Sequence, residues 1–281
     1  MPKDMGDDFG SDFDAGSSEK KQFGGVSFKW ENLLPIIVII IVILLIVFKT
    51  NILAGAGLFS TSQGARILVL GAPSQETRQI LNDQENKDLI KEARILTLAS
   101  IEHNPAERVK GYDIIILDQS LQSDKSISRR TADAITDYVK KGGKLIVVLN
   151  SGIERPNDVS VLGWQANFGD IIPVSCDMIN SVPSCKSPKD LQGTLYASLE
   201  SHPIMKGIMQ VPAIETSGPI RTTTFEVAVD GKEIAYLEDD RTNKYYTGIV
   251  EKSLLMGKVI YFNFNPGISK AIFINTIEYL K

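Results

Sequence analysis

The longest apolar run in the chain lies near its N-terminus. Residues 33–48 are sixteen positions without a charged or hydrogen-bonding side chain, which would form a helix about 24 Å long. A transmembrane helix needs about 20 apolar residues, and Trp30 and residues 52–54 extend the run on its two sides. The pattern predicts a transmembrane helix over residues 32–54. A buried core helix or strand is the alternative.

The placement of lysine decides the orientation that we expect for this helix. Lys20, Lys21 and Lys29 precede it, and only Lys49 follows it closely. Because Lys and Arg are enriched on the cytoplasmic side of membrane helices, we expect a single-pass protein of the cell membrane with a cytoplasmic N-terminus and an extracytoplasmic C-terminal domain. A cleaved signal peptide is the alternative, although the long acidic segment before the run differs from the short basic start of such peptides.

The residues on either side of the apolar run have the composition of unstructured chain. Residues 1–31 contain four Lys, seven Asp or Glu and four Phe, with no hydrophobic period. Such a segment buries too little surface to offset the entropy of ordering, so we expect a disordered acidic tail; a short linear motif that docks on a partner is the alternative. The Gly and Ser residues of 55–64 predict a flexible linker.

The remaining residues, 65–281, alternate apolar runs with helical patterns. Strands are predicted at 66–70, 94–98, 112–117, 144–149, 225–229, 234–237, 245–250 and 259–264. Helices are predicted within 75–92, 127–141 and 269–280. Alternating strands and helices are typical of a parallel sheet that is covered by helices. The expected fold class is therefore α/β, with a flavodoxin-like, mostly parallel sheet, helices on both of its faces and the single transmembrane helix before it.

Polar side chains follow several of the predicted strands. Ligands bind at the carboxyl ends of the strands in open α/β sheets, so we expect a ligand-binding crevice at that edge. Its expected residues are Ser74, Asp118, Gln119, Asn150 and Ser151. An ordinary strand-end turn is the alternative for residues 150–152, because Asn, Ser and Gly are common in turns.

Four segments resemble, in their order along the chain, the class I glutamine amidotransferase-like superfamily. They are 112–117, 138–148, the SHPIMKGI of 201–208 and the GKVIYF of 257–262. The similarity is to its non-catalytic branches, which include the extracytoplasmic auxiliary subunits of gliding-type ABC transporters. The resemblance implies that residues 65–281 form one amidotransferase-like α/β domain.

Enzymes of this superfamily place a nucleophile on a tight turn after the strand that corresponds to 144–149, and a His-Pro-Glu sequence near the C-terminus. The turn in this chain reads LNSGI over 149–153, without cysteine, and the later segment reads NPG over 265–267. An amide cannot accept a proton at neutral pH and glycine has no carboxylate, so the resemblance implies that the catalytic triad is lost. The same register adds Asn265 to the expected crevice.

Few side chains in the chain are suited to metal binding. Cys176 and Cys185 are the only cysteines, and no histidine is near them in the sequence, so we expect no metal site. In an extracytoplasmic domain the two cysteines are expected to form a disulfide; free thiols are the alternative in a reducing compartment. The net charge of −4 excludes a basic nucleic-acid-binding protein.

These observations predict a membrane-anchored, non-enzymatic binding or scaffold protein, a pseudoenzyme that serves an envelope transporter or a surface assembly. Its expected partners are the membrane and an envelope protein or a carbohydrate ligand, with no cofactor and no nucleic acid. One alternative is a membrane-anchored hydrolase with Ser151 as nucleophile and either His103 or His202 as base. A structural stalk without a ligand is another.

Overall fold

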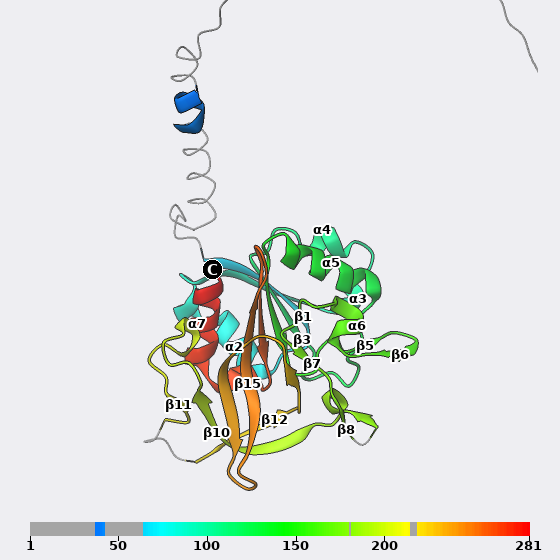
Figure 1. Cartoon of the computed structure of the whole chain (residues 1–281), viewed down its shortest axis with the longest axis vertical. Helices are drawn as coiled ribbons and strands as arrows, with labels where there is room; N and C mark the ends of the chain where they lie inside the picture. Colours follow the sequence, from blue (N-terminus) through cyan, green and yellow to red (C-terminus); the bar gives the residue numbers. More distant parts are fainter. Residues whose placement is uncertain (1–36, 43–63, 180, 214–217) are drawn as a thin grey trace, which may run out of the picture. The chain divides into compact units, whose positions relative to one another are not determined.

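The computed structural model describes residues 37–42, 64–179, 181–213 and 218–281 (Figure 1). The chain divides into two units, Met1–Ser60 and Thr61–Lys281. In the first unit the described residues, 37–42, are helical and their side chains are exposed. The second unit contains the strands and the two hydrophobic cores of the protein.

The prediction of a transmembrane helix is not supported. In the described ranges no helix is long and apolar enough to cross a membrane. The predictions of a transmembrane helix and of a single-pass membrane location, with a cytoplasmic N-terminus and an extracytoplasmic domain, are therefore wrong. The rest of 32–54, the tail 1–31 and residues 55–63 of the linker lie outside the described residues.

Ten strands of the second unit form one sheet, in the order β11-β10-β14-β15-β16-β4-β3-β1-β2, with β12 also paired to β10. The strands are β1 (Ala65–Gly71), β2 (Ile90–Leu96), β3 (Ile114–Asp118), β4 (Lys144–Val148), β10 (Lys189–Ala197), β11 (Gln210–Val211), β12 (Ile220–Thr224), β14 (Lys232–Asp239), β15 (Lys244–Ser253) and β16 (Lys258–Phe262). The pairs from β2 to β16 are parallel, and the pairs from β16 to β11 and β12 are antiparallel.

The expectation of a flavodoxin-like, mostly parallel sheet is therefore wrong, because the sheet is mixed. The physical reason lies in two short connections. Residues 240–243 join β14 to β15 and residues 254–257 join β15 to β16. A parallel pair needs a crossover of a dozen or more residues, whereas a hairpin needs only a few. The coarser prediction, an α/β fold with helices on both faces of the sheet, agrees with the structure.

The helices cover the parallel half of the sheet on both faces (Figure 1). One hydrophobic core contains residues of α2 (Gln75–Asn82) and α7 (Lys270–Leu280). The other contains residues of α3 (Leu98–Ile101), α4 (Pro105–Val109), α5 (Arg129–Lys140) and α6 (Trp164–Phe168). In β3, Ile114 and Ile116 belong to the first core, and Ile115 and Leu117 to the second. This two-sided burial explains the uninterrupted apolar run in the sequence.

Among the described residues, three two-stranded sheets and four 3-10 helices lie outside the large sheet. The pairs are β5 (Glu154–Arg155) with β6 (Asp158–Leu162), β7 (Val174–Ser175) with β13 (Ala228–Val229), and β8 (Met178–Ile179) with β9 (Val182–Pro183). The 3-10 helices are η2 (Gln84–Asn86), η3 (Ser184–Lys186), η4 (Pro203–Met205) and η5 (Pro266–Ile268). The predicted disulfide between Cys176 and Cys185 is confirmed, and it joins the two ends of the β8–β9 hairpin.

The disulfide should stabilise the folded domain. The cysteines are nine positions apart, and closing a loop of that length contributes about 3 kcal/mol in the chain-entropy model. We expect the double variant Cys176→Ala, Cys185→Ala to lose about that much unfolding free energy in urea denaturation. Equal unfolding midpoints for the variant and the unaltered protein would show that the disulfide contributes nothing to stability.

Candidate functional site

Several of the predicted crevice residues do meet at the carboxyl edge of β1, β3 and β4, where Gly71, Asp118 and Val148 are in register. The backbone N–H of Gln119 donates to Ser151 Oγ at 2.8 Å, and the N–H of Gly152 donates to Gln119 Oε1 at 2.8 Å.

A second network forms at the start of α2. Ser74 caps this helix, and its hydroxyl contacts Asn265 Oδ1 at 3.0 Å. The amide of Asn150 instead donates to the carbonyl of Cys185 at 3.3 Å, so this side chain is directed toward the disulfide segment. Five of the six expected residues therefore form two networks and one separate contact, and Asp118 is described below. The role of all six in ligand binding stays a prediction.

Ser151 has no base beside it. Its buried hydroxyl donates to the carbonyl of Val148 at 2.6 Å while it accepts from Gln119. Among the described residues, neither histidine forms a hydrogen bond with Ser151: the ring of His202 bonds to Glu251 and to the N–H of Ile204. Since a serine nucleophile needs a base within hydrogen-bond reach, the hydrolase alternative is withdrawn.

Asp118 is the unusual group at this edge. Its side chain is fully buried, and Oδ1 accepts the N–H of Ser120 at 2.9 Å. In the part of the chain that the structure describes, Oδ2 has no hydrogen-bond partner, and neither does the buried Ser120 hydroxyl nearby. Burial raises the pKa of Asp118 to about 6, although contacts with Ser120 and the positive charges of Lys125 and Arg78 oppose the rise. A buried carboxylate with an unused oxygen is typical of a functional site.

The two strand ends beside Asp118 have unusual backbone. Gly71 has φ +122°, and a Cβ there would lie 2.2 Å from the carbonyl oxygen of Asp118. Leu149, directly after β4, has φ 51°, a left-handed conformation that costs a non-glycine residue about 1–2 kcal/mol. Such strain tends to occur at functional sites. Nothing in the sequence identified Arg78 or Lys125 as part of this edge, and nothing in it indicated the left-handed conformation of Leu149.

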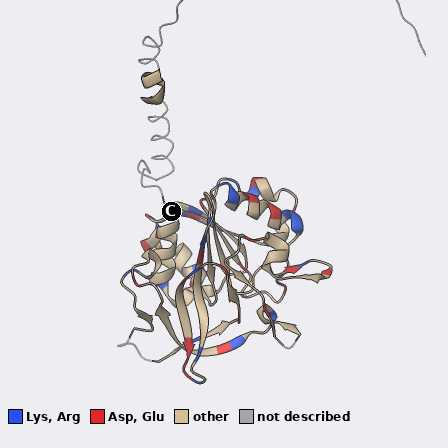
Figure 2. Ribbon diagram, viewed as in Figure 1, with Lys and Arg blue, Asp and Glu red and all other residues tan. Residues whose placement is uncertain are grey.

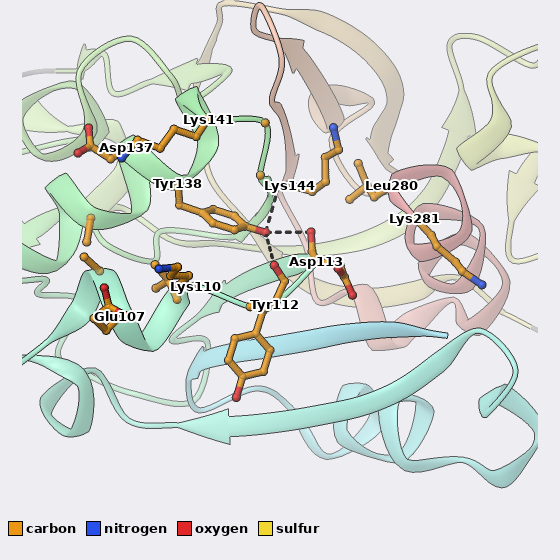
Figure 3. Close-up of a pocket in the computed structure, with 16 residues that line it drawn as sticks. Glu107, Lys110, Tyr112, Asp113, Asp137, Tyr138, Lys141, Lys144, Leu280 and Lys281 are labelled. Carbon is orange, nitrogen blue, oxygen red and sulfur yellow. Dashed lines mark hydrogen bonds between the residues drawn. The ribbon is translucent and has the colours of Figure 1, made fainter. Parts of the chain in front are cut away.

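A pocket of about 620 Å³ lies at the opposite edge of the sheet, where the parallel strands begin (Figure 3). Charged side chains of both signs line it: Glu107, Lys110, Asp113, Asp137, Lys141, Lys144 and Lys281. Figure 2 shows the same mixture of acidic and basic residues along α5. Because acidic and basic side chains both line the pocket in similar numbers, it favours neither anionic nor cationic ligands.

The floor of this pocket is formed by Tyr138 of α5. Its hydroxyl donates to the carbonyl of Asp113 at 2.8 Å and accepts the N–H of Lys144 at 3.3 Å (Figure 3). Its ring lies directly over Gly143, where a Cβ would be 2.2 Å from the ring carbon Cε1. Tyr138 therefore holds the end of α5 against the starts of β3 and β4, which is a structural role.

Gly143→Ala should destabilise the domain by about 1–3 kcal/mol, the usual cost of overpacking. The cause is the clash with the Tyr138 ring, so Gly143→Ala should cost much less in a Tyr138→Ala background. Urea denaturation of the two single variants and the double variant measures this coupling. Additive losses would show that the ring does not restrict position 143.

A buried ionic cluster joins β15, β16, α7 and the η4 turn. The Nε2–H of His202 donates to Glu251 Oε2 at 2.8 Å, and Nδ1 accepts the N–H of Ile204 at 3.3 Å, which is the neutral form of the ring. Burial lowers the pKa of His202, although Glu251 opposes this. Burial raises the pKa of Glu251, but hydrogen bonds and charge from Lys258, with bonds from Tyr279 and Ser253, outweigh it and leave this pKa lowered.

The cluster should make stability depend on pH. His202 has a lower pKa in the folded than in the unfolded protein, so its contribution is present above about pH 6.5 and is lost as the pH falls below that value. We expect the advantage of the unaltered protein over His202→Gln, measured as unfolding free energy, to shrink between pH 7 and pH 5. A constant difference across that range would contradict this assignment.

Comparisons with known proteins identify the fold but no family. No family profile and no curated protein matches the chain. It is similar to a β-galactosidase from Bacillus circulans sp. alkalophilus, with 12% identity and a TM-score of 0.52, over 78% of this chain and 31% of that one. A cytoplasmic protein from Salmonella typhimurium has 14% identity and a TM-score of 0.48, over 76% of this chain and 98% of that one.

An exo-β-1,4-mannosidase from an Opitutaceae bacterium has 9% identity and a TM-score of 0.39, over 78% of this chain and 34% of that one. The chain thus spans about a third of the two glycosidases. At such identities a likeness shows the fold alone, and of these three only the β-galactosidase reaches a TM-score at which it carries an argument.

The likeness to the β-galactosidase overturns the resemblance to the glutamine amidotransferase-like superfamily. The physical reason is that the quoted segments describe common elements: the segment 201–208 forms a capped 3-10 turn, and 257–262 is β16 with the residue before it. The predictions of a membrane-anchored binding or scaffold function, of a pseudoenzyme and of service to an envelope transporter depended on this resemblance and on the transmembrane helix. These predictions are therefore wrong. The expected envelope protein partner or carbohydrate ligand stays a prediction.

Proposed function

We propose that the second unit binds a small polar molecule at the carboxyl edge of β3, through the Asp118 carboxylate. The observation that carries the proposal is the buried Asp118 Oδ2, which has no hydrogen bond of ordinary geometry among the described residues. The Ser120 hydroxyl likewise has no well-formed bond there, and its side chain lies close enough to the carboxyl to lower the pKa of Asp118. The left-handed backbone of Gly71 and Leu149 on the neighbouring strand ends supports it. Open α/β sheets bind ligands at this edge.

The charges around Asp118 restrict the ligand. The carboxylate accepts hydrogen bonds, while Arg78 and Lys125 are near enough to lower its pKa. These two cations already offset the single negative charge, so a cationic ligand gains little. A neutral molecule with hydroxyl or amide donors, such as a polyol or a small saccharide, suits the site best.

Binding requires the loop after β3 to move, because the Asp118 side chain is fully buried in this structure. The ammonium group of Lys125 donates to the carbonyls of Gln119 and Ser120 and holds this loop closed. Gln119 adds two further bonds, from its amide to the carbonyls of Asp124 and Ser126. In the bound state, the loop moves away from Asp118 Oδ2 and the Ser120 hydroxyl. Hydrogen-bonding groups of the ligand then take its place beside these two atoms.

A calorimetric screen of the full chain at pH 7 tests this function, with neutral polyols, monosaccharides, amides and amino acids as probes. We expect one class to bind, and Asp118→Asn to weaken it about 10- to 100-fold, since hydrogen bonds to charged groups contribute about 1.5–3 kcal/mol. Asp170→Asn, at an exposed aspartate on another loop, is the matched control. Undiminished binding by the Asp118 variant, or no binding by any probe, would overturn the proposal.

The same substitution should stabilise the free protein. The pKa of Asp118 is higher in the folded than in the unfolded protein, so the folded state loses stability as the pH rises from about 4 to about 6. We expect Asp118→Asn to raise the unfolding free energy at pH 7 by roughly 1–3 kcal/mol, and to leave it little changed at pH 4. Thermal unfolding at both pH values measures this, and destabilisation at pH 7 would contradict it.

A further inference from the structure

Three tyrosines lie next to one another on the antiparallel half of the sheet, far in sequence from the residues around Asp118. Tyr196 of β10 is in register with Tyr236 of β14, and Tyr245 of β15 is in register with Glu238 of β14. The ring centroids of Tyr196 and Tyr236 are 5.4 Å apart, and those of Tyr236 and Tyr245 are 5.6 Å apart. The three rings therefore form a row across three strands, which we call the tyrosine row.

The rings of the tyrosine row differ in what they present to solvent. Tyr196 and Tyr236 stack with an angle of 25° between their planes, so each covers a face of the other. Tyr245 is turned by 67° relative to Tyr236 and is 61% exposed. Its ring therefore offers apolar surface to a ligand, while the other two rings are half-buried beside it.

Polar side chains share this face with the tyrosine row. The negative charge of Glu238 and a hydrogen bond with it raise the pKa of the Tyr245 hydroxyl, so the two groups are in contact. Alternation along β10 places Thr194 and Gln192 on the same face as Tyr196, and Gln192 is in register with Arg221 of β12. The tyrosine row thus has a carboxylate and a hydroxyl beside it, and an amide and a guanidinium group lie further along the same face.

A hollow of about 410 Å³ lies beyond the tyrosine row. It is lined in part by Gln192, Arg221 and Arg241. The guanidinium group of Arg241 is held by the carboxylate of Asp239, at 3.2 Å, and by the carbonyl of Asp190. Asp239 alternates with Glu238 along β14, so Arg241 is held toward the opposite face of the sheet. A ligand that lies along the tyrosine row meets this hollow on the side of Gln192 and Arg221.

We propose that the tyrosine row and this hollow bind an extended saccharide chain. Saccharides combine apolar C–H faces with dense hydroxyl groups. An exposed aromatic ring beside a carboxylate, with amide and guanidinium groups further along the same face, complements both features. Cross-strand aromatic pairs also stabilise sheets, but that role does not require the exposure of Tyr245, which has more than half of its surface in water.

Affinity electrophoresis of the full chain in native gels that contain soluble galactan, mannan or hydroxyethylcellulose tests this site. We expect retardation by at least one polysaccharide. Tyr245→Ala should weaken it about tenfold, the upper part of the range for one aromatic contact, whereas Tyr245→Phe should retain most of it. Leu255→Ala, which removes a fully exposed apolar side chain on another hairpin, is the matched control and should not change retardation.

The test separates this site from the one at Asp118, because Asp118→Asn should leave retardation by the polysaccharide intact. Thermal unfolding of the Tyr245 variants shows whether they remain folded. The proposal is overturned if none of the three polysaccharides retards the protein, or if folded Tyr245→Ala migrates as the unaltered protein does.

Discussion

The pairing of β16 with β4 is the interaction on which the rest of the second unit depends. β16 is parallel to β4 on one side and antiparallel to β15 on the other, so it joins the two halves of the sheet. Val259 and Tyr261 enter one hydrophobic core, and Ile260 and Phe262 enter the other. The carbonyl of Phe262 also accepts the N–H of Leu149, at 2.7 Å, which holds that residue in its left-handed conformation.

Much of the fold could be predicted from the sequence, and the failures have physical causes. The predicted strands 66–70, 112–117 and 144–149 lie close to β1, β3 and β4, because strands buried on both faces leave continuous apolar runs. β10 was missed because its apolar residues alternate with polar ones and a glycine. The prediction of a mostly parallel sheet failed because it applied the strand–helix alternation of the first half to the whole domain. The connections between the later predicted strands are too short for parallel crossovers.

The candidate site could be predicted only in part. Asp118 and Gln119 follow a clear strand, so the sequence places them at a carboxyl edge. Arg78 reaches the same edge from α2, and Lys125 from the loop after β3, because of packing that no local pattern encodes. The tyrosine row depends on the register of three strands, and one residue of slip would turn each ring to the other face. Both proposed sites thus depend on the mixed sheet that β16 joins.

The central claim is that the buried Asp118 carboxyl is kept, at a cost in stability, for a ligand. Carbon-13 NMR titration of the Asp118 side-chain carboxyl, assigned by comparison with Asp118→Asn, measures its pKa directly. The account predicts a pKa of about 6 in the free protein, and a lower value once a ligand donates hydrogen bonds to the carboxylate. A pKa near the ordinary aspartate value of about 4 in the free protein would contradict it, because the carboxyl would then be hydrated or fully paired.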